Sequence, residues 1–97
     1  MDLSEWRARI DTVDQQLVDL LNQRMLYVLE IGRLKREHGK PVQDLERERA
    51  ILERLSAYNQ GPLSTQAIED LFNRIIQEAR NLEETQGHID GLAGEGA

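Results

Sequence analysis

Residues 6–35, WRARIDTVDQQLVDLLNQRMLYVLEIGRLK, decide the fold. Their apolar side chains recur at steps of three and four, the period of one face of an α-helix. The pattern extends from about Ser4 to His38 and stops at Gly39, a residue that commonly ends helices. We therefore expect a single helix of about 35 residues, roughly 52 Å long.

Two further helical patterns follow, over about residues 45–59 and 65–86. Each of the three expected helices is preceded by a residue whose side-chain oxygen can cap a helix N-terminus, namely Asp2, Asp44 and Ser64. Residues 87–97, GHIDGLAGEGA, are Gly-rich and aperiodic, which is typical of a flexible tail. The sequence thus predicts an all-α domain over residues 1–86, with one long and two shorter helices.

The length of the first helix has a consequence for assembly. A compact domain of this size has a radius of gyration of about 13 Å, so two shorter helices cannot cover an apolar stripe that runs along roughly 52 Å. A second copy of the chain is the simplest source of the missing surface. We expect an intertwined helical homodimer, and an ordinary antiparallel coiled-coil dimer is the alternative.

Composition and charge exclude several classes of function. The net charge of −6 disfavours binding to a phosphate backbone, so nucleic acid is not an expected partner. The chain has no cysteine and no apolar run long enough to span a membrane, and a cytoplasmic location is expected. His38 and His88 show no metal-ligand spacing, so no metal site is predicted.

Charged residues interrupt the apolar stripes. Arg24 and Lys35 are eleven residues apart in the first helix and point the same way within about 20°. Glu48 falls within the stripe of the second helix and Glu83 within that of the third. One interpretation is that these residues form buried salt bridges that fix register, or extend to water at the stripe edge. The other is that they converge on a polar ligand site.

Such a site would contain cations and carboxylates without an evident nucleophile. The serines have no neighbouring His and Asp arrangement for acyl transfer. Arg7 lies some 26 Å along the helix from Arg24, so it cannot easily serve the same pocket within one chain, but it could project into the pocket of a partner in a dimer. Gly32 is isolated within the first helix, where it permits close approach of a ligand or a neighbouring helix.

Two stretches together resemble the all-helical (AroQ) class of chorismate mutases. They are RARIDTVDQQLVDLLNQRMLYVLEIGRLKREHGKPVQDLERERAILERL at 7–55 and LFNRIIQEARNLEE at 71–84, and the resemblance covers residues 3 to about 86. Its motifs are R-x-x-I-D, the spacing of Arg24 and Lys35, and P-V-x-D-x-x-R-E. The resemblance implies an intertwined dimer that converts chorismate to prephenate, in phenylalanine and tyrosine biosynthesis, without cofactor or metal.

The resemblance also implies roles for individual residues. Arg24, with Arg7 of the other subunit, would hold the two substrate carboxylates, supported by Arg47, while Asp44 lines the pocket. Glu48 would accept a hydrogen bond from the ring hydroxyl. Lys35 would donate to the ether oxygen, where negative charge develops as the C–O bond breaks.

Two positions depart from the family's common pattern. Ala79 stands where many relatives have serine, which removes one hydroxyl contact to a carboxylate. Glu83 stands where some relatives have glutamine, and a carboxyl group can donate to the ether oxygen only when it is protonated. The resemblance thus implies Lys35, Glu83 and Arg24 as the catalytic residues.

Two other functions remain open at this point. Isochorismate pyruvate lyase shares the scaffold and the cationic pocket, although Glu48 argues for the mutase. A non-catalytic helical module that binds a metabolite, or docks on another enzyme of the aromatic pathway, is the second alternative. Domains of this kind also occur fused to other enzymes of the pathway, so fusion or docking is an expected form of partnership.

Overall fold

The computed structural model describes residues 1–95, which form three helices. They are α1 (Leu3–Glu37), α2 (Leu45–Tyr58) and α3 (Thr65–Glu95), and none of the described residues lies in a β-strand. The predicted all-α class, with one long helix and two shorter ones, is confirmed.

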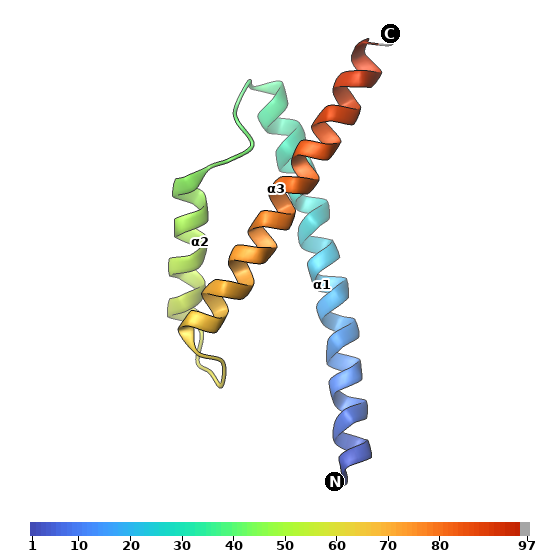
Figure 1. The fold of residues 1–97 in the computed structure, drawn as a ribbon, viewed down its shortest axis with the longest axis vertical. Coiled ribbons are helices and arrows are strands. Elements are labelled where there is room, and N and C mark those ends of the chain that lie inside the picture. Colours follow the sequence, from blue (N-terminus) through green and yellow to red (C-terminus); the bar gives the residue numbers. More distant parts are fainter. Residues whose placement is uncertain (96–97) are drawn as a thin grey trace.

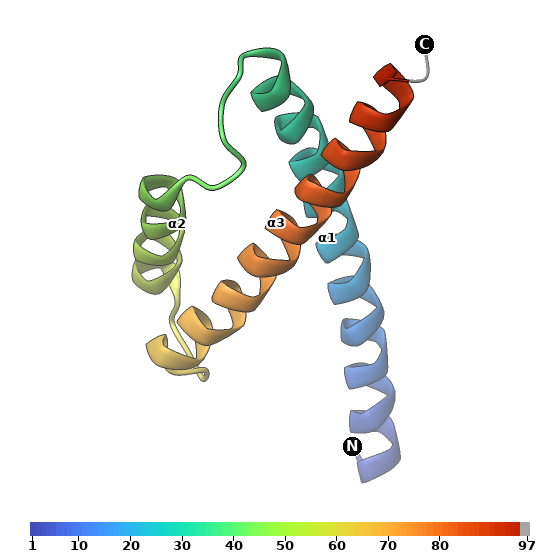
Figure 2. The same ribbon diagram turned by 45° about the horizontal axis from the view of Figure 1, so that its top comes forward.

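Helix α3 is the central element of the fold. It crosses α1 near the C-terminal half of that helix and lies against α2, whereas the N-terminal half of α1 extends away from both (Figures 1 and 2). The Cα radius of gyration is 17.4 Å and the longest dimension 60 Å, well above the radius of about 13 Å expected for a compact domain of about 100 residues. The chain is therefore elongated and open.

The free half of α1 carries uncovered apolar side chains. Trp6, Ile10, Val13 and Leu17 are between 51% and 57% exposed. This agrees with the expectation that the chain cannot cover its own long helix. Such a row of exposed apolar residues is typical of an interaction surface, and its burial against a second copy remains a prediction.

The ends of α1 have the expected chemistry. The Asp2 carboxylate accepts from the Glu5 N–H at 2.9 Å, and the Glu5 side chain accepts in return from the Asp2 N–H, which completes a capping box. At the other end Gly39 adopts φ +64°, and the Lys40 N–H donates to the Lys35 carbonyl at 2.8 Å. Glycine adopts this left-handed conformation without steric cost, which explains why the helix stops there.

The other two N-caps are also as predicted. The Asp44 carboxylate accepts from the Arg47 N–H at 3.0 Å, and the Ser64 hydroxyl accepts from the Ala67 N–H at 3.0 Å. Each side chain satisfies one of the backbone N–H groups that a helix leaves unpaired at its start. The predicted starts of α2 and α3 are therefore confirmed.

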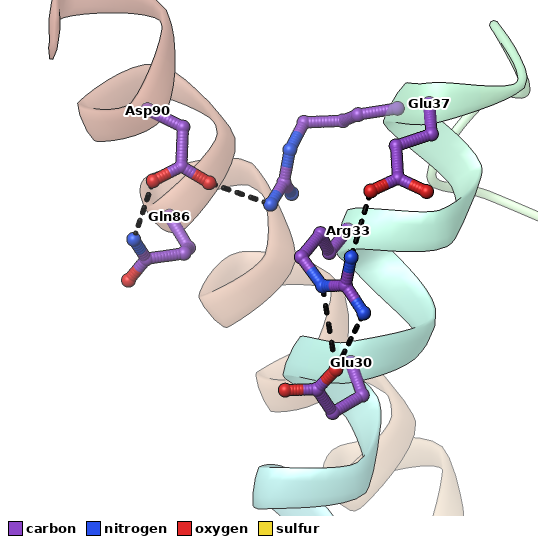
Figure 3. Close-up of polar contacts among 6 residues, drawn as sticks. Glu30, Arg33, Glu37, Gln86 and Asp90 are labelled. Carbon is purple, nitrogen blue, oxygen red and sulfur yellow. Dashed lines mark hydrogen bonds and ion pairs between the residues drawn. The ribbon is translucent and has the colours of Figure 1, made fainter.

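The predicted end of the third helix near Gln86 is wrong, because α3 continues to Glu95. Asp90 of this extension accepts from Arg36 of α1 at 2.6 Å and from Gln86 at 2.9 Å, and Figure 3 shows the extension beside the last turns of α1. These contacts offset the low helix propensity of the glycines. Gly96 and Ala97, the end of the expected tail, lie outside the described residues.

Candidate active site

A cavity of about 450 Å³ is lined by all three helices and by the loop between α1 and α2. Its walls include every described residue classed as buried, apart from Gly32. These residues are Val28, Ile51, Ile76, Ala79 and Glu83. The small core of the chain therefore serves as the wall of the cavity.

The cavity gathers charged side chains from each element. Four cationic and three anionic residues line it: Arg24, Lys35, Arg47, Arg80, Asp44, Glu48 and Glu83. Seven of the eight predicted site residues, Ala79 included, thus lie around one cavity. The charged residues predicted to converge therefore line one cavity, whereas the use of this cavity as a ligand site and the roles of its residues remain predictions.

Arg7 is the predicted residue that lies elsewhere. It is exposed on the N-terminal half of α1, beside Asp2 and Asp11. The helical rise separates it from Arg24 by roughly 26 Å. Within one chain, Arg7 cannot reach the cavity.

An ion pair between Lys35 and Glu83 forms one wall. The Lys35 ammonium donates to Glu83 Oε2 at 3.2 Å and to the Val42 carbonyl at 2.7 Å, and the two side chains are 21% and 7% exposed. Glu83 is the one charged residue classed as buried among the described residues. Because an ammonium group has three donors, one remains for an acceptor in the cavity.

Arg24 lies in a crowded cationic environment. Burial lowers the pKa of its guanidinium group, and the positive charges of Arg47 and Arg54 lower it further. Its Nη1 atom is buried and has no hydrogen-bond partner among the described residues. Both observations indicate that Arg24 is arranged to meet an anion, since a bound negative charge would relieve the repulsion and accept the hydrogen bond.

Gly32 sets the distance between α1 and α3. It is buried, and a Cβ atom at this position would lie 3.2 Å from Glu83 Cγ. That distance is tighter than an ordinary van der Waals contact, so a Cβ atom here would require the Glu83 side chain to shift, whereas glycine leaves room for it as it stands. The expected close approach is therefore to a neighbouring helix.

Arg80 lines the cavity but was missed from the sequence. It follows Ile76 by four residues and precedes Glu83 by three, so all three lie on one side of α3. The periodicity that identified Glu83 thus also pointed to Arg80. An arginine beside an apolar stripe is usually a solvated flank residue, and only the packing distinguishes the two cases.

Neither a metal-binding cluster nor a membrane-spanning helix is present in the described part of the chain. Among the side chains that the structure describes, no three His, Asp or Glu residues are grouped so that they could hold a metal ion. None of the described helices combines the length and apolar character that a membrane span requires.

Comparison with known proteins identifies the family. Residues 6–84 match the family model of chorismate mutase type II. A chorismate mutase structure from Thermus thermophilus (Form II) superposes with a TM-score of 0.85 at 38% identity, covering 87% of this chain and 96% of that one. A chorismate mutase from Helicobacter pylori in complex with prephenate gives a TM-score of 0.79 at 31% identity, covering 86% and 90%.

A curated relative adds information on length. The bifunctional chorismate mutase/prephenate dehydratase of Buchnera aphidicola is 37% identical over 79 residues, which are 80% of this chain and 20% of that protein. The chain thus spans about a fifth of the length of the first curated relatives it matches. The match with the family model nevertheless covers most of the chain and all of the cavity residues, so the chain belongs to the chorismate mutase type II family.

Proposed function

We propose that this chain is a chorismate mutase, which converts chorismate to prephenate. The observation that carries the proposal is the cavity, in which cationic and carboxylate side chains surround an apolar floor without a serine, cysteine or histidine among the lining residues. Such a site can bind a small dianion and place charge around it. The family match and the prephenate complex of the Helicobacter pylori relative support the same substrate and product.

The chemistry requires little else. In the Claisen rearrangement an ether C–O bond breaks while a C–C bond forms within the same molecule, so no proton, electron or group is exchanged with the protein. The site has to hold the compact conformer and stabilise the polarised transition state with charges already in place. Fixed side chains on three helices suit that task, since they need no reorganisation during the reaction.

We assign the substrate carboxylates to arginine. Arg24 would bind one of them through its fork of N–H donors, supported by Arg47, and Asp44 would orient these cations. Burial lowers the pKa of Arg24, and the crowding of positive charge around it lowers the pKa further; this supports the assignment, because a bound carboxylate would offset the crowding.

The reacting ether oxygen is assigned to Lys35. Two of its three donors are engaged by Val42 and Glu83, so the third would be directed to the oxygen that gains negative charge. Glu48 would accept from the ring hydroxyl. Glu83 would hold Lys35 in place as its ion-pair partner.

We further propose that the active form is a homodimer in which Arg7 of the partner subunit completes each site. The exposed apolar row on the N-terminal half of α1 supports this, because an uncovered stripe of that length favours association with a second copy. A mutase unit of residues 1–86 is likewise a proposal. It is supported by the family match, which ends at residue 84, and by the cavity residues, of which Glu83 is the last.

The direct test is to mix purified protein with chorismate, follow the loss of the substrate's ultraviolet absorbance, and identify the product. Prephenate is the expected product. A parallel assay uses isochorismate, from which released pyruvate would instead identify a lyase. Turnover of neither substrate would leave a binding module. A variant with Lys40→Ala, on an exposed loop outside the cavity, is a suitable control and should react like the wild type.

A further inference from the structure

Arg80 is held in place by Gln77 of its own helix and lies close to Glu48 of α2. Its Nη2 atom donates to Gln77 Oε1 at 2.6 Å, which ties the outer end of the guanidinium group to its own helix. Its Nε atom is buried, has no hydrogen-bond partner among the described residues, and lies 4.0 Å from Glu48 Oε2. The side chains of Arg80 and Glu48 are 25% and 21% exposed, respectively.

Glu48 depends on this arginine for its nearest positive charge. The Lys35 ammonium is already paired with Glu83, and Arg80 is the only cation within 4.0 Å of the Glu48 carboxylate among the described residues. A partly buried carboxylate without a counter-charge is unfavourable and turns toward water. Arg80 therefore supplies the attraction that can hold Glu48 on the cavity wall.

We propose that Arg80 is a positioning residue of this site, which orients the Glu48 carboxylate toward the ring hydroxyl of the substrate and is itself oriented by Gln77. The inference rests on the proposed mutase function. Ala79 and Arg80 are neighbours on the α3 side of the cavity, and the methyl group of Ala79 offers no hydrogen bond. Of these two residues, only Arg80 can act on Glu48 through a polar group. At 4.0 Å the pair leaves Glu48 free to accept the substrate hydroxyl, since no direct hydrogen bond occupies its oxygen.

The test is a double-mutant cycle on kcat/KM with chorismate. Arg80→Met keeps an unbranched stem of similar length but removes the charge, and it should lower kcat/KM about 10-fold. If Arg80 acts through Glu48, the same substitution in a Glu48→Gln background should change kcat/KM by less than about 2-fold. Arg80→Lys should recover part of the loss, because it restores a positive charge without the planar fork.

A matched control lies on the same helix. Arg74 is 77% exposed, pairs with Glu78 at 2.9 Å and is not part of the cavity wall. Arg74→Met should therefore leave kcat and KM unchanged. If Arg80→Met prevents folding, as judged by far-ultraviolet circular dichroism, Gln77→Ala serves as the second variant, since it releases Arg80 without removing it and should lower kcat/KM several-fold.

The outcomes separate the inference from the function. If the wild type is active and Arg80→Met has an unchanged kcat/KM, the role of Arg80 is overturned but the proposed function is not. Equal losses in the wild-type and Glu48→Gln backgrounds would show that Arg80 acts independently of Glu48, which also overturns the inference. Wild-type protein that does not turn over chorismate would overturn the proposed function, and this inference with it.

Discussion

Lys35 and Glu83 are 48 residues apart in the sequence and form an ion pair of 3.2 Å across α1 and α3. Glu83 is buried and Lys35 partly buried, so the pair sits where solvent screens it weakly. Gly32 leaves room for this contact, because a Cβ atom at its position would press on Glu83 Cγ at 3.2 Å and require it to shift. The ammonium group is thus fixed before any substrate binds, which is the arrangement that electrostatic catalysis requires.

Lys35→Ala should reduce kcat by about 10²- to 10³-fold while the helical content is retained. The substitution removes the donor proposed for the ether oxygen, and loss of one preorganised donor typically has an effect of this size. Steady-state kinetics with chorismate, together with far-ultraviolet circular dichroism, checks both parts. Wild-type turnover in this variant would contradict the role assigned to Lys35.

Arg24→Met should abolish most activity without destabilising the fold. The pKa of Arg24 is lowered by burial and by Arg47 and Arg54, so the charged form is less favourable in the native state than in the unfolded chain. Since arginine stays protonated in both states at all ordinary pH values, this unfavourable contribution does not vary with pH. Denaturant unfolding should show an equal or higher free energy of unfolding, with kcat/KM at least about 10²-fold lower.

Arg33 provides the opposite case as a control. Its pKa is raised by a hydrogen bond with Glu30 and by the charges of Glu37 and Glu30, and these contacts appear in Figure 3. Its ion pairs therefore favour the folded state while Arg33 and its two glutamate partners are all charged, although exposure to solvent keeps the effect small. Arg33→Met should slightly lower the free energy of unfolding and leave activity unchanged. A clear loss of stability in Arg24→Met, exceeding that in Arg33→Met, is the result that contradicts the argument.

Local chemistry in the sequence was sufficient to predict most of the fold. Asp2, Asp44 and Ser64 cap the helices as expected, because capping depends on a few adjacent residues. The end of α3 could not be predicted in this way. Propensity alone disfavours a helix through Gly87 and Gly91, and the contact of Arg36 with Asp90 joins residues 54 positions apart.

The site was predicted to a similar extent, and for similar reasons. Glu48 and Glu83 were identifiable because each falls within an apolar stripe, where a charge is costly. Arg80 was missed because it lies at the edge of its stripe, and only the distance to Glu48 reveals its place. Arg7 could be assigned by resemblance alone, since its proposed target belongs to another molecule.

The assignment of Arg7 to the site of the partner subunit predicts complementation between two inactive variants. Arg7→Ala and Arg24→Ala homodimers should each lose at least about 10²-fold in kcat/KM. When equal amounts are unfolded together and refolded, half of the dimers are mixed. Each mixed dimer then contains one site with both arginines, so activity should recover to about a quarter of the wild-type value.

This recovery is specific to a shared site. If Arg7 acted on the cavity of its own chain, each subunit of a mixed dimer would still lack one arginine, and mixing would restore nothing. A refolded mixture of Arg24→Ala and Lys35→Ala controls for nonspecific rescue. Both residues line the same cavity of one chain, so every site in a mixed dimer lacks one of them and the mixture should stay inactive. Sedimentation analysis must show dimers in both mixtures. A monomer, or a mixed dimer without activity, would remove Arg7 from the proposed site and leave the substrate with only the cations of a single chain.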